Sequence, residues 1–183
     1  MLRNGADGIS FESIVAFGEN TSMPHAVPTD RQLKSGDIIQ FDFGAKYKGY
    51  CSDFSRVVFV AEMKDAYKEL YDFVLEQQQK IVEEFKDGTN VKNVIKSRET
   101  DYKLNNYEVM HAFGHGLGLD IHEEPVLSSR RDLFLKENSI LAIEPGVYKM
   151  GRFGIRIEDT YHITKDSCIN LTNSGKEYNI IKL

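Results

Sequence analysis

Four carboxylates and one imidazole stand inside or beside apolar runs, where a purely structural position would favour Val or Ile. They are Asp42, Asp53, His115, Glu144 and Glu158. Carboxylates that converge in a protein core repel one another, and their pKa values rise unless cations neutralise them. Two divalent cations would supply the positive charge that such a site needs. These five positions therefore constrain the fold more than any other feature of the chain.

Each of the five residues lies in a short and distinctive setting. Asp42 and Asp53 lie in F-D-F-G-A-K-Y-K-G-Y-C-S-D, two alternating runs joined by a turn-like segment, which predicts a β-hairpin. His115 lies in G-H-G-L-G-L-D-I-H-E-E-P, Glu144 in A-I-E-P-G-V-Y, and Glu158 in G-I-R-I-E-D. One such acid alone could equally be an ordinary carboxylate at a strand end. All five in this order form a specific signal.

These segments resemble the "pita-bread" metallopeptidases, which comprise methionine aminopeptidases, Xaa-Pro aminopeptidases and Xaa-Pro dipeptidases. The resemblance covers nearly the whole chain and matches all five metal-ligand positions in type and order. It implies that Asp42 chelates one metal ion and that His115 and Glu144 bind the other. Asp53 and Glu158 would bridge both ions. The implied cofactors are two divalent metal ions, with Mn²⁺ favoured by the carboxylate ligands and Co²⁺ or Zn²⁺ as alternatives.

The spacing of apolar residues predicts an α+β fold. Apolar residues recur at three- and four-residue steps through residues 66–86, which predicts a long amphipathic helix that ends at D87-G. Thr89 is predicted to cap a second helix. The apolar positions of this helix are Val91, Val94, Ile95 and Tyr102. Alternating runs predict strands at residues 14–17, 38–43, 56–60, 109–113, 139–144 and 155–164.

The family's fold consists of two halves related by a pseudo-two-fold axis, an antiparallel sheet with helices on its outer face. The second half, from about Ala66, carries both predicted helices, whereas the first half has none. Residues 1–183 are therefore interpreted as one metallopeptidase catalytic domain that is N-terminally incomplete, with a truncated first half. On this interpretation Ile14, Val15 and Phe17 would lie on an uncovered sheet face, which would favour self-association or low stability.

Three more histidines match functional positions of the resembled family. The resemblance implies that His122 donates to the oxyanion of a tetrahedral intermediate. It implies that His25 contacts the substrate near the scissile bond and that His111 is an additional histidine of the prolyl branch. Glu144 would also be catalytic, because it would carry a proton from the attacking water to the leaving nitrogen.

Arg156 distinguishes between the branches of the family. It lies two residues before Glu158 on one predicted strand, so both side chains point to the same face. Prolyl members carry an arginine here, within reach of the first aspartate ligand, whereas methionine aminopeptidases tend to carry a neutral amide. A surface salt bridge is the alternative role for Arg156. Tyr148, after E-P-G-V, is also typical of the prolyl branch.

The sequence therefore predicts an enzyme, a dinuclear metal-dependent exopeptidase that hydrolyses the bond between an N-terminal residue and proline. It would be an Xaa-Pro aminopeptidase or an Xaa-Pro dipeptidase. A methionine aminopeptidase is an alternative, which Arg156, Tyr148 and His111 together disfavour. A catalytically silent pita-bread binding module is another. The expected partner is a peptide with a free N-terminus, and a homodimer is expected.

Composition excludes other classes of function. A length of 183 residues suits one domain, and a formal net charge of −5 without a basic stripe argues against nucleic acid or an anionic membrane as partner. Cys51 and Cys168 are too few for a disulfide framework, which indicates a reducing compartment. No apolar run approaches ~18 residues and no signal-peptide pattern opens the chain, so a cytoplasmic location is expected.

Overall fold

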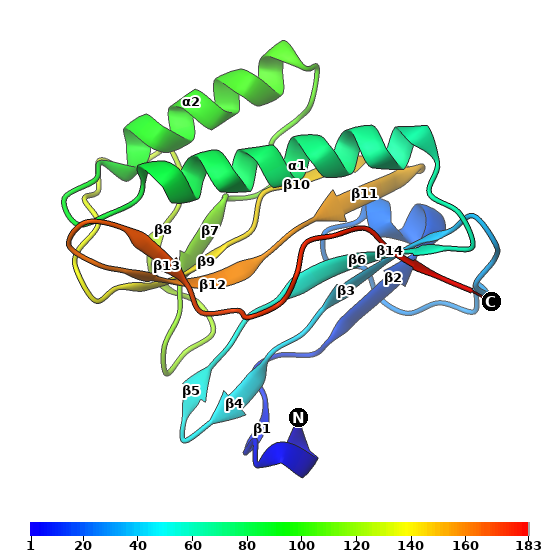
Figure 1. Cartoon of the computed structure of the whole chain (residues 1–183), viewed down its shortest axis with the longest axis horizontal. Helices are drawn as coiled ribbons and strands as arrows, with labels where there is room; N and C mark the ends of the chain where they lie inside the picture. Colours follow the sequence, from blue (N-terminus) through cyan, green and yellow to red (C-terminus); the bar gives the residue numbers. More distant parts are fainter. Residues whose placement is uncertain (183) are drawn as a thin grey trace.

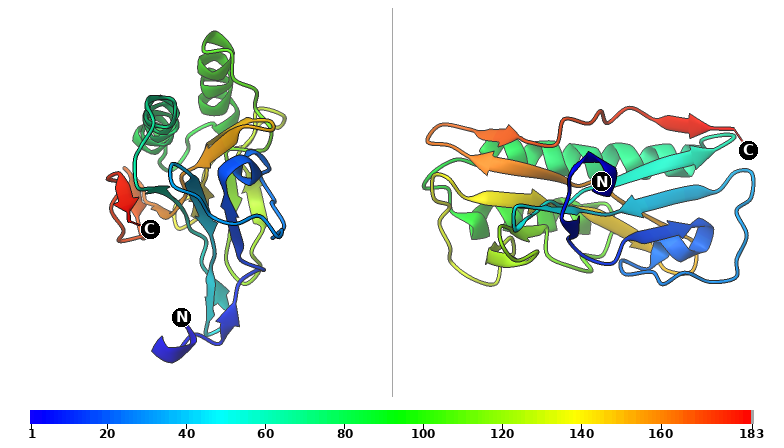
Figure 2. Two further views of the ribbon diagram at one scale, coloured as in Figure 1. Left: turned by 90° about the vertical axis from the view of Figure 1, so that its right-hand side faces the viewer. Right: turned by 90° about the horizontal axis from the view of Figure 1, so that it is seen from below.

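The computed structural model describes residues 1–182 and has the mixed α+β architecture that the sequence predicts. Its two helices, α1 (Asp65–Glu84) and α2 (Val91–Leu104), lie on the same side of the strands (Figures 1 and 2). Two short 3₁₀ segments, η1 (Leu2–Asn4) and η2 (Gly18–Ser22), belong to the N-terminal part. The N-terminal η1 projects away from the helices, as Figure 2 shows.

The first half of the chain builds a four-stranded sheet in the order β14-β6-β3-β2. These strands are β2 (Ile14–Phe17), β3 (Ile38–Asp42), β6 (Ser55–Val60) and β14 (Asn179–Ile181). The β3–β6 pair is the predicted hairpin, and β14 joins it in parallel from the C-terminal end of the chain. A small sheet extends the hairpin beyond its turn: β1 (Gly8–Ile9), β4 (Ala45–Tyr47) and β5 (Tyr50–Cys51).

The second half builds a five-stranded antiparallel sheet in the order β13-β12-β9-β7-β8. Its strands are β7 (Gly114–Gly116), β8 (Glu123–Val126), β9 (Ile140–Ile143), β12 (Asp159–Ile163) and β13 (Cys168–Asn170). A separate hairpin consists of β10 (Gly146–Lys149) and β11 (Phe153–Arg156). A single bridge between Ser55 and Glu158 joins the two larger sheets. The predicted ligands from both halves meet near this bridge.

The helices bury the apolar stripes that their sequences predict. On α1 the buried apolar side chains are Tyr67, Leu70, Tyr71, Val74 and Ile81, and on α2 they are Val91, Val94, Ile95 and Tyr102. They belong to one apolar cluster that also contains side chains of β3, β6, β9, β11 and β12. Fully burying one such side chain contributes roughly 1.5–3 kcal/mol, so the helices fix the strands that carry the site.

Three predicted details of local structure are wrong. Residues 155–164 do not form one strand, because β11 ends at Arg156 and β12 begins at Asp159. Asn90, not Thr89, caps α2, because its side chain accepts a hydrogen bond from the backbone N–H of Asn93 at 3.2 Å. The Thr89 hydroxyl instead donates to the backbone oxygen of Glu84 at 3.0 Å, at the end of α1. Residues 109–113 form no strand, and ladder pairing begins only at β7. Val109 and its neighbour Met110 are both exposed, so their alternation does not mark a buried face.

The uncovered face predicted for the first strands exists only in part. Val15 is exposed, with 43% of its surface accessible. Phe17 is half-buried, and the guanidinium carbon of Arg31 lies 5.3 Å from its ring centroid. The prediction is wrong for Ile14, which pairs opposite Asp42 and lines a cavity together with it.

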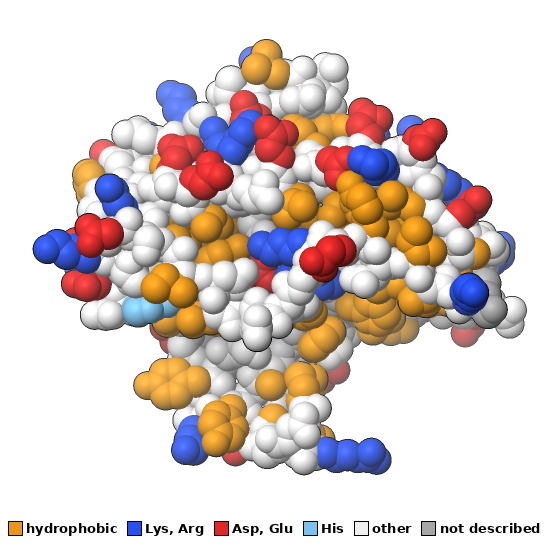
Figure 3. All heavy atoms as spheres, viewed as in Figure 1, with side chains coloured by type: hydrophobic (Ala, Val, Ile, Leu, Met, Phe, Trp, Pro, Cys, Tyr) orange, Lys and Arg blue, Asp and Glu red, His pale blue; other side chains and the backbone are white. Residues whose placement is uncertain are grey.

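Figure 3 shows the surface over α1 and the C-terminal segment, where charges of both signs alternate along the helix. Apolar side chains gather near β14, where Tyr178, Ile180 and Ile181 are exposed. Within residues 1–182 neither helix has the length and apolar character needed to cross a membrane.

Candidate metal centre

All five predicted metal ligands line one cavity of about 600 Å³. They come from the end of β3, the β5–β6 link, β7, the β9–β10 link and the β11–β12 link: Asp42, Asp53, His115, Glu144 and Glu158. Four of these residues are buried and Glu144 is half-buried. A larger cavity of about 730 Å³ is lined by Asp53 but by none of the other four. The fold thus brings residues from more than a hundred positions apart to one place.

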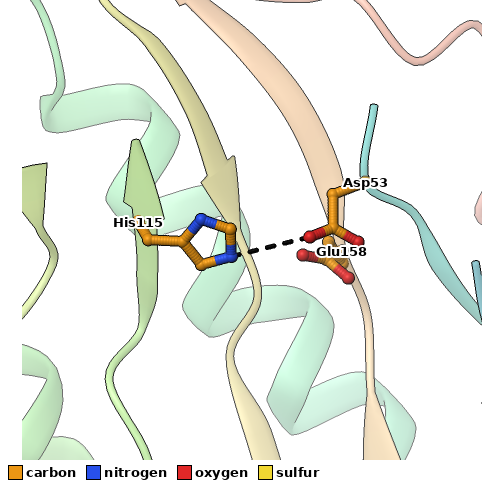
Figure 4. Close-up of side chains that lie close together, drawn as sticks. All are labelled: Asp53, His115 and Glu158. Atoms are coloured by element: carbon orange, nitrogen blue, oxygen red, sulfur yellow. Dashed lines mark ion pairs between the residues drawn. The ribbon is translucent and has the colours of Figure 1, made fainter. Parts of the chain in front are cut away.

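Asp53, His115 and Glu158 form the tightest part of this site. One oxygen or nitrogen atom of each lies within 4.8 Å of the other two, and Figure 4 shows the three side chains pointing toward one another. His115 Nε2 lies 3.5 Å from Asp53 Oδ2 and 3.7 Å from Glu144 Oε1. His115 Nδ1 lies 2.9 Å from the backbone oxygen of Gly116, which can only accept. Nδ1 therefore donates to this oxygen, and Nε2 is the ring nitrogen that faces the carboxylates.

Two glycines allow His115 to occupy this position. A Cβ atom on Gly114 would lie 2.0 Å from the backbone oxygen of Ala142, and one on Gly116 would lie 2.3 Å from that of Glu124. Gly114 also adopts a φ of 149°, a backbone conformation that residues other than glycine rarely adopt. The G-H-G segment can therefore lie close to both neighbouring strands, β8 and β9.

Ser55 is a site residue that the sequence reasoning missed. Its hydroxyl donates to Glu158 Oε2 at 2.8 Å and accepts from Arg156 Nε at 3.2 Å. The residue is completely buried. Ser55 lies two residues after Asp53, a spacing that would place both side chains on one face if the strand extended back to Asp53, and this is the signal that could have identified it.

Arg156 is buried, so a surface salt bridge is excluded as its role. Its Nη2 lies 2.5 Å from Asp42 Oδ2, which places it within reach of the first aspartate as predicted. Its Nη1 donates to the Tyr148 hydroxyl at 2.6 Å. That hydroxyl lies 2.8 Å from His111 Nε2, while His111 Nδ1 lies 2.6 Å from the backbone oxygen of Ala112. His111 Nδ1 therefore donates, and Nε2 accepts from Tyr148.

The electrostatics of the site show an excess of negative charge. Burial raises the pKa of Glu144 to about 7, although Arg156 and His115 oppose this shift. Burial and the neighbouring carboxylates hold the pKa of Glu158 well above its usual range. Burial also raises the pKa of Asp42 more than Arg156 lowers it. A site with these properties takes up protons unless cations replace them.

The donor set fits divalent cations. Among the described residues Asp42 Oδ1 is a buried oxygen without a hydrogen-bond donor. Buried acceptors normally have a partner, and a metal ion is the partner that four carboxylates and one imidazole suit. Four ionised carboxylates carry four negative charges and the Arg156 guanidinium offsets one of them, so the site retains negative charge that divalent cations would neutralise.

The residues predicted to be catalytic surround an adjoining cavity of about 450 Å³. Its lining includes His25, His111, His122, Glu144 and Arg156, together with apolar groups of Pro24, Ala112 and Val126. The rings of His122 and His115 lie edge to face, with centroids 4.4 Å apart. Burial, then the nearby His115, lowers the pKa of His122, which favours a neutral imidazole. Every predicted site residue therefore lines one or both of two adjoining cavities.

The fold and the site define a metal-binding domain of the pita-bread type. The model of metallopeptidase family M24 matches residues 1–165. The chain belongs to this family.

Curated relatives share more than a third of its residues. An Xaa-Pro dipeptidase of Pyrococcus horikoshii is 37% identical over 180 residues, which are 97% of this chain and 51% of that protein. An uncharacterised peptidase of Bacillus subtilis is 39% identical over 183 residues, covering 99% of this chain and 52% of the relative. The chain spans about half the length of the curated relatives it matches.

Solved structures confirm the predicted fold. An X-Pro aminopeptidase from Thermotoga maritima superposes with a TM-score of 0.93 at 36% identity, over 98% of this chain and 51% of that one. A recombinant prolidase from Thermococcus sibiricus gives a TM-score of 0.93 at 39% identity, over 98% of this chain and 49% of that one. The family resemblance predicted from the sequence is thereby confirmed.

Proposed function

We propose that this chain carries the machinery of a dinuclear metal-dependent exopeptidase that cleaves the bond between an N-terminal residue and proline. The observation that carries the proposal is the convergence of four carboxylates and His115 Nε2 on one cavity, with the buried Arg156 paired to Asp42. Relatives named Xaa-Pro dipeptidase and X-Pro aminopeptidase support the choice of substrate.

Two divalent cations would be held by the five residues that line the cavity. Asp42 would bind one ion, His115 and Glu144 the other, and Asp53 and Glu158 both. When bound, the ions polarise the scissile carbonyl and lower the pKa of water. Mn²⁺ is the proposed ion because oxygen ligands predominate, with Co²⁺ and Zn²⁺ as alternatives.

Glu144 is the proposed proton carrier. Its pKa of about 7 in the protein without metal ions shows how strongly burial favours the protonated carboxyl. One of its carboxylate oxygens would accept a proton from the attacking water and deliver it to the leaving nitrogen. This delivery matters for proline, because the nitrogen of an Xaa-Pro bond carries no hydrogen of its own. The neutral His122 would donate an N–H to the developing oxyanion.

Arg156 and His111 line the second cavity, and the Tyr148 hydroxyl links them through hydrogen bonds to both. Burial, then the positive charge of Arg156, lowers the pKa of His111 to about 4, so its ring is neutral. Each of the three side chains is fixed by a neighbour, since Arg156 also donates to the backbone oxygen of Pro24 at 3.2 Å. The apolar lining beside these residues suits a proline ring, and His25 would contact the substrate from the loop that contains Pro24.

The test combines a metal titration with a substrate comparison. The purified chain, freed of metal ions with a chelator, is expected to bind two Mn²⁺ ions and then to hydrolyse Ala-Pro and Ala-Pro-Ala but not Met-Ala-Ala. Asp53→Asn and Glu158→Gln are each expected to lose at least one ion. The ratio of the two Xaa-Pro rates distinguishes a dipeptidase from an aminopeptidase.

Each alternative predicts a different result. A preference for Met-Ala-Ala would indicate a methionine aminopeptidase, and two bound ions without any hydrolysis would indicate a silent binding module. Only trace metal in a folded protein would refute the proposed centre. A homodimer is also proposed, and light scattering after size-exclusion chromatography tests it. A cytoplasmic location stays a prediction from composition.

A further inference from the structure

A completely buried glutamine of α1 reaches the backbone beside two of the proposed metal ligands. Gln78 Nε2 donates to the backbone oxygen of Ile143 at 2.9 Å and to that of Ile157 at 3.2 Å. These residues immediately precede Glu144 and Glu158 in the chain. One side-chain amide therefore holds both ligand-bearing segments from the helix side of the sheet.

The backbone ladder is interrupted at this point. Pairing between β9 and β12 ends at Ile143 and Asp159, pairing between β10 and β11 begins at Gly146 and Arg156, and the two ligands lie in the gap between them. The Glu144 N–H donates to the backbone oxygen of Phe113, at 2.9 Å, whereas the Glu158 N–H donates to that of Ser55, at 3.2 Å. The two ligand-bearing segments thus bond to different neighbours. A long bond from the Ile157 N–H to the Pro145 oxygen, at 3.4 Å, is their direct backbone link in this region.

The donors and acceptors around the Gln78 amide determine its orientation. Lys176 Nζ lies 2.6 Å from Gln78 Oε1, and it also contacts Asp159 Oδ2 at 2.6 Å and the Tyr161 hydroxyl at 3.0 Å. An ammonium group can only donate, and the two backbone carbonyls can only accept. The amide oxygen must therefore face Lys176 and the amide nitrogen must face the carbonyls.

The adjacent Gln77 provides a matched comparison. Its side chain is as deeply buried on the same helix, at 1% exposure against 0% for Gln78. Within residues 1–182 its amide makes no hydrogen bond to a ligand-bearing segment, and its Oε1 has no partner. The two residues share type, helix and burial and differ in what their amides contact.

We propose that Gln78 is a positioning residue of the metal centre, which sets the separation of Glu144 and Glu158 through the backbone carbonyls that precede them. This inference rests on the proposed metal centre formed by those ligands. Removing the amide takes one donor from each of two buried carbonyls and abolishes the side-chain link between the two segments, so we expect the segments to shift. Groups that orient metal ligands typically change metal affinity 10–100-fold when they are lost.

The experiment compares Gln78→Met with Gln77→Met, since methionine has a similar length and no donor. Chelator-treated proteins are dialysed against graded Mn²⁺ concentrations, and bound metal is counted by mass spectrometry. Near-ultraviolet circular dichroism checks that each variant is folded before dialysis. Wild type and Gln77→Met are expected to bind two ions with equal affinity. Gln78→Met is expected to bind at least one ion about tenfold more weakly.

Equal Mn²⁺ affinity in all three proteins would overturn the inference and leave the proposed function standing. Equal weakening in both variants would overturn it too, because α1 packing in general would then be the cause. If Gln78→Met does not fold, Lys176→Met takes its place, since it frees the amide to rotate and should weaken binding several-fold. Unchanged affinity in Lys176→Met would then refute the inference. A wild-type protein that binds no Mn²⁺ would refute the proposed centre and this inference together.

Discussion

Substitution of Asp159 by Asn tests how much the buried charges behind the metal centre contribute to stability. Asp159 lies on β12 and is completely buried. Its Oδ1 lies 2.5 Å from Arg56 Nη2, and its Oδ2 lies 2.6 Å from Lys176 Nζ. Removing the carboxylate leaves Arg56 as a buried charge without an acidic partner. Breaking a buried pair in this way typically costs about 3–5 kcal/mol.

The structure places the expected cost near the lower end of this range. Arg56 also donates to four backbone oxygens, those of Ser55, Glu158, Ser174 and Gly175. The asparagine can still accept one hydrogen bond, and Lys176 is partly exposed to solvent. We therefore expect a loss of about 3 kcal/mol in the free energy of unfolding. For a chain of this size that corresponds to a decrease of about 6–12 °C in Tm.

Urea denaturation of the metal-free protein, followed by circular dichroism, measures the loss without a contribution from bound ions. The matched control is Glu76→Gln, which breaks an exposed pair on α1 whose Lys80 Nζ to Oε1 distance is 2.8 Å. That variant should lose no more than about 0.5 kcal/mol. A loss below about 1 kcal/mol for Asp159→Asn, with an unchanged m-value, would refute the argument that Arg56 depends on this carboxylate.

Three further predictions concern single side chains. Ser55→Ala should weaken Mn²⁺ binding about tenfold because Glu158 loses its hydroxyl donor, whereas Ser55→Thr should not; equal dialysis curves for the two variants would contradict this. Gly114→Ala should lower Tm sharply, because its Cβ would overlap the backbone 2.0 Å away, and a wild-type Tm in a thermal scan would contradict the steric argument. Burial raises the pKa of the Cys168 thiol to about 12, so iodoacetamide at pH 8 should modify it about a thousandfold more slowly in the folded than in the urea-unfolded chain. The stability that this raised pKa contributes is complete below about pH 8.5 and is lost as pH rises toward 12, because only the unfolded chain then releases the proton; rapid modification of the folded chain at pH 8 would contradict the shift.

The metal ligands can be predicted from the sequence because each is a polar residue among apolar or glycine neighbours. Glu158 follows an apolar residue in a strand-like run, and His115 stands between two glycines. A charged group at such a position is costly to bury, so its presence indicates a compensating partner. The hairpin around Asp42 and the helix after Ala66 can also be predicted, because the spacing of apolar residues, about two in strands and about 3.6 in helices, is a local property of the sequence.

Details that depend on which of several residues or strands makes a contact are harder to predict from the sequence. Thr89 and Asn90 are both good helix caps, and the choice between them depends on where α1 ends, since Thr89 bonds back to that helix. Residues 109–113 alternate as a strand does, yet within residues 1–182 no strand pairs with residues 109–112, and Phe113 makes backbone hydrogen bonds to Leu127 and Glu144. An alternating pattern indicates a strand only if a partner strand exists, and that depends on the fold of the whole chain.

The role of Gln78 can be predicted from the sequence only in part. It lies in the apolar stripe of α1, between Val74 and Ile81, where an apolar residue is expected. A polar residue is as unexpected there as Glu158 is in its own apolar run. Gln77 is equally unexpected in this stripe, so the pattern identifies both residues as buried amides that need hydrogen-bond partners. It does not indicate which of the two contacts the site. Only the fold distinguishes them, since successive helical residues point about 100° apart and one amide meets the carbonyls beside Glu144 and Glu158. A buried polar residue in a helix stripe therefore predicts that a partner exists, and the tertiary structure decides whether that partner belongs to the functional site.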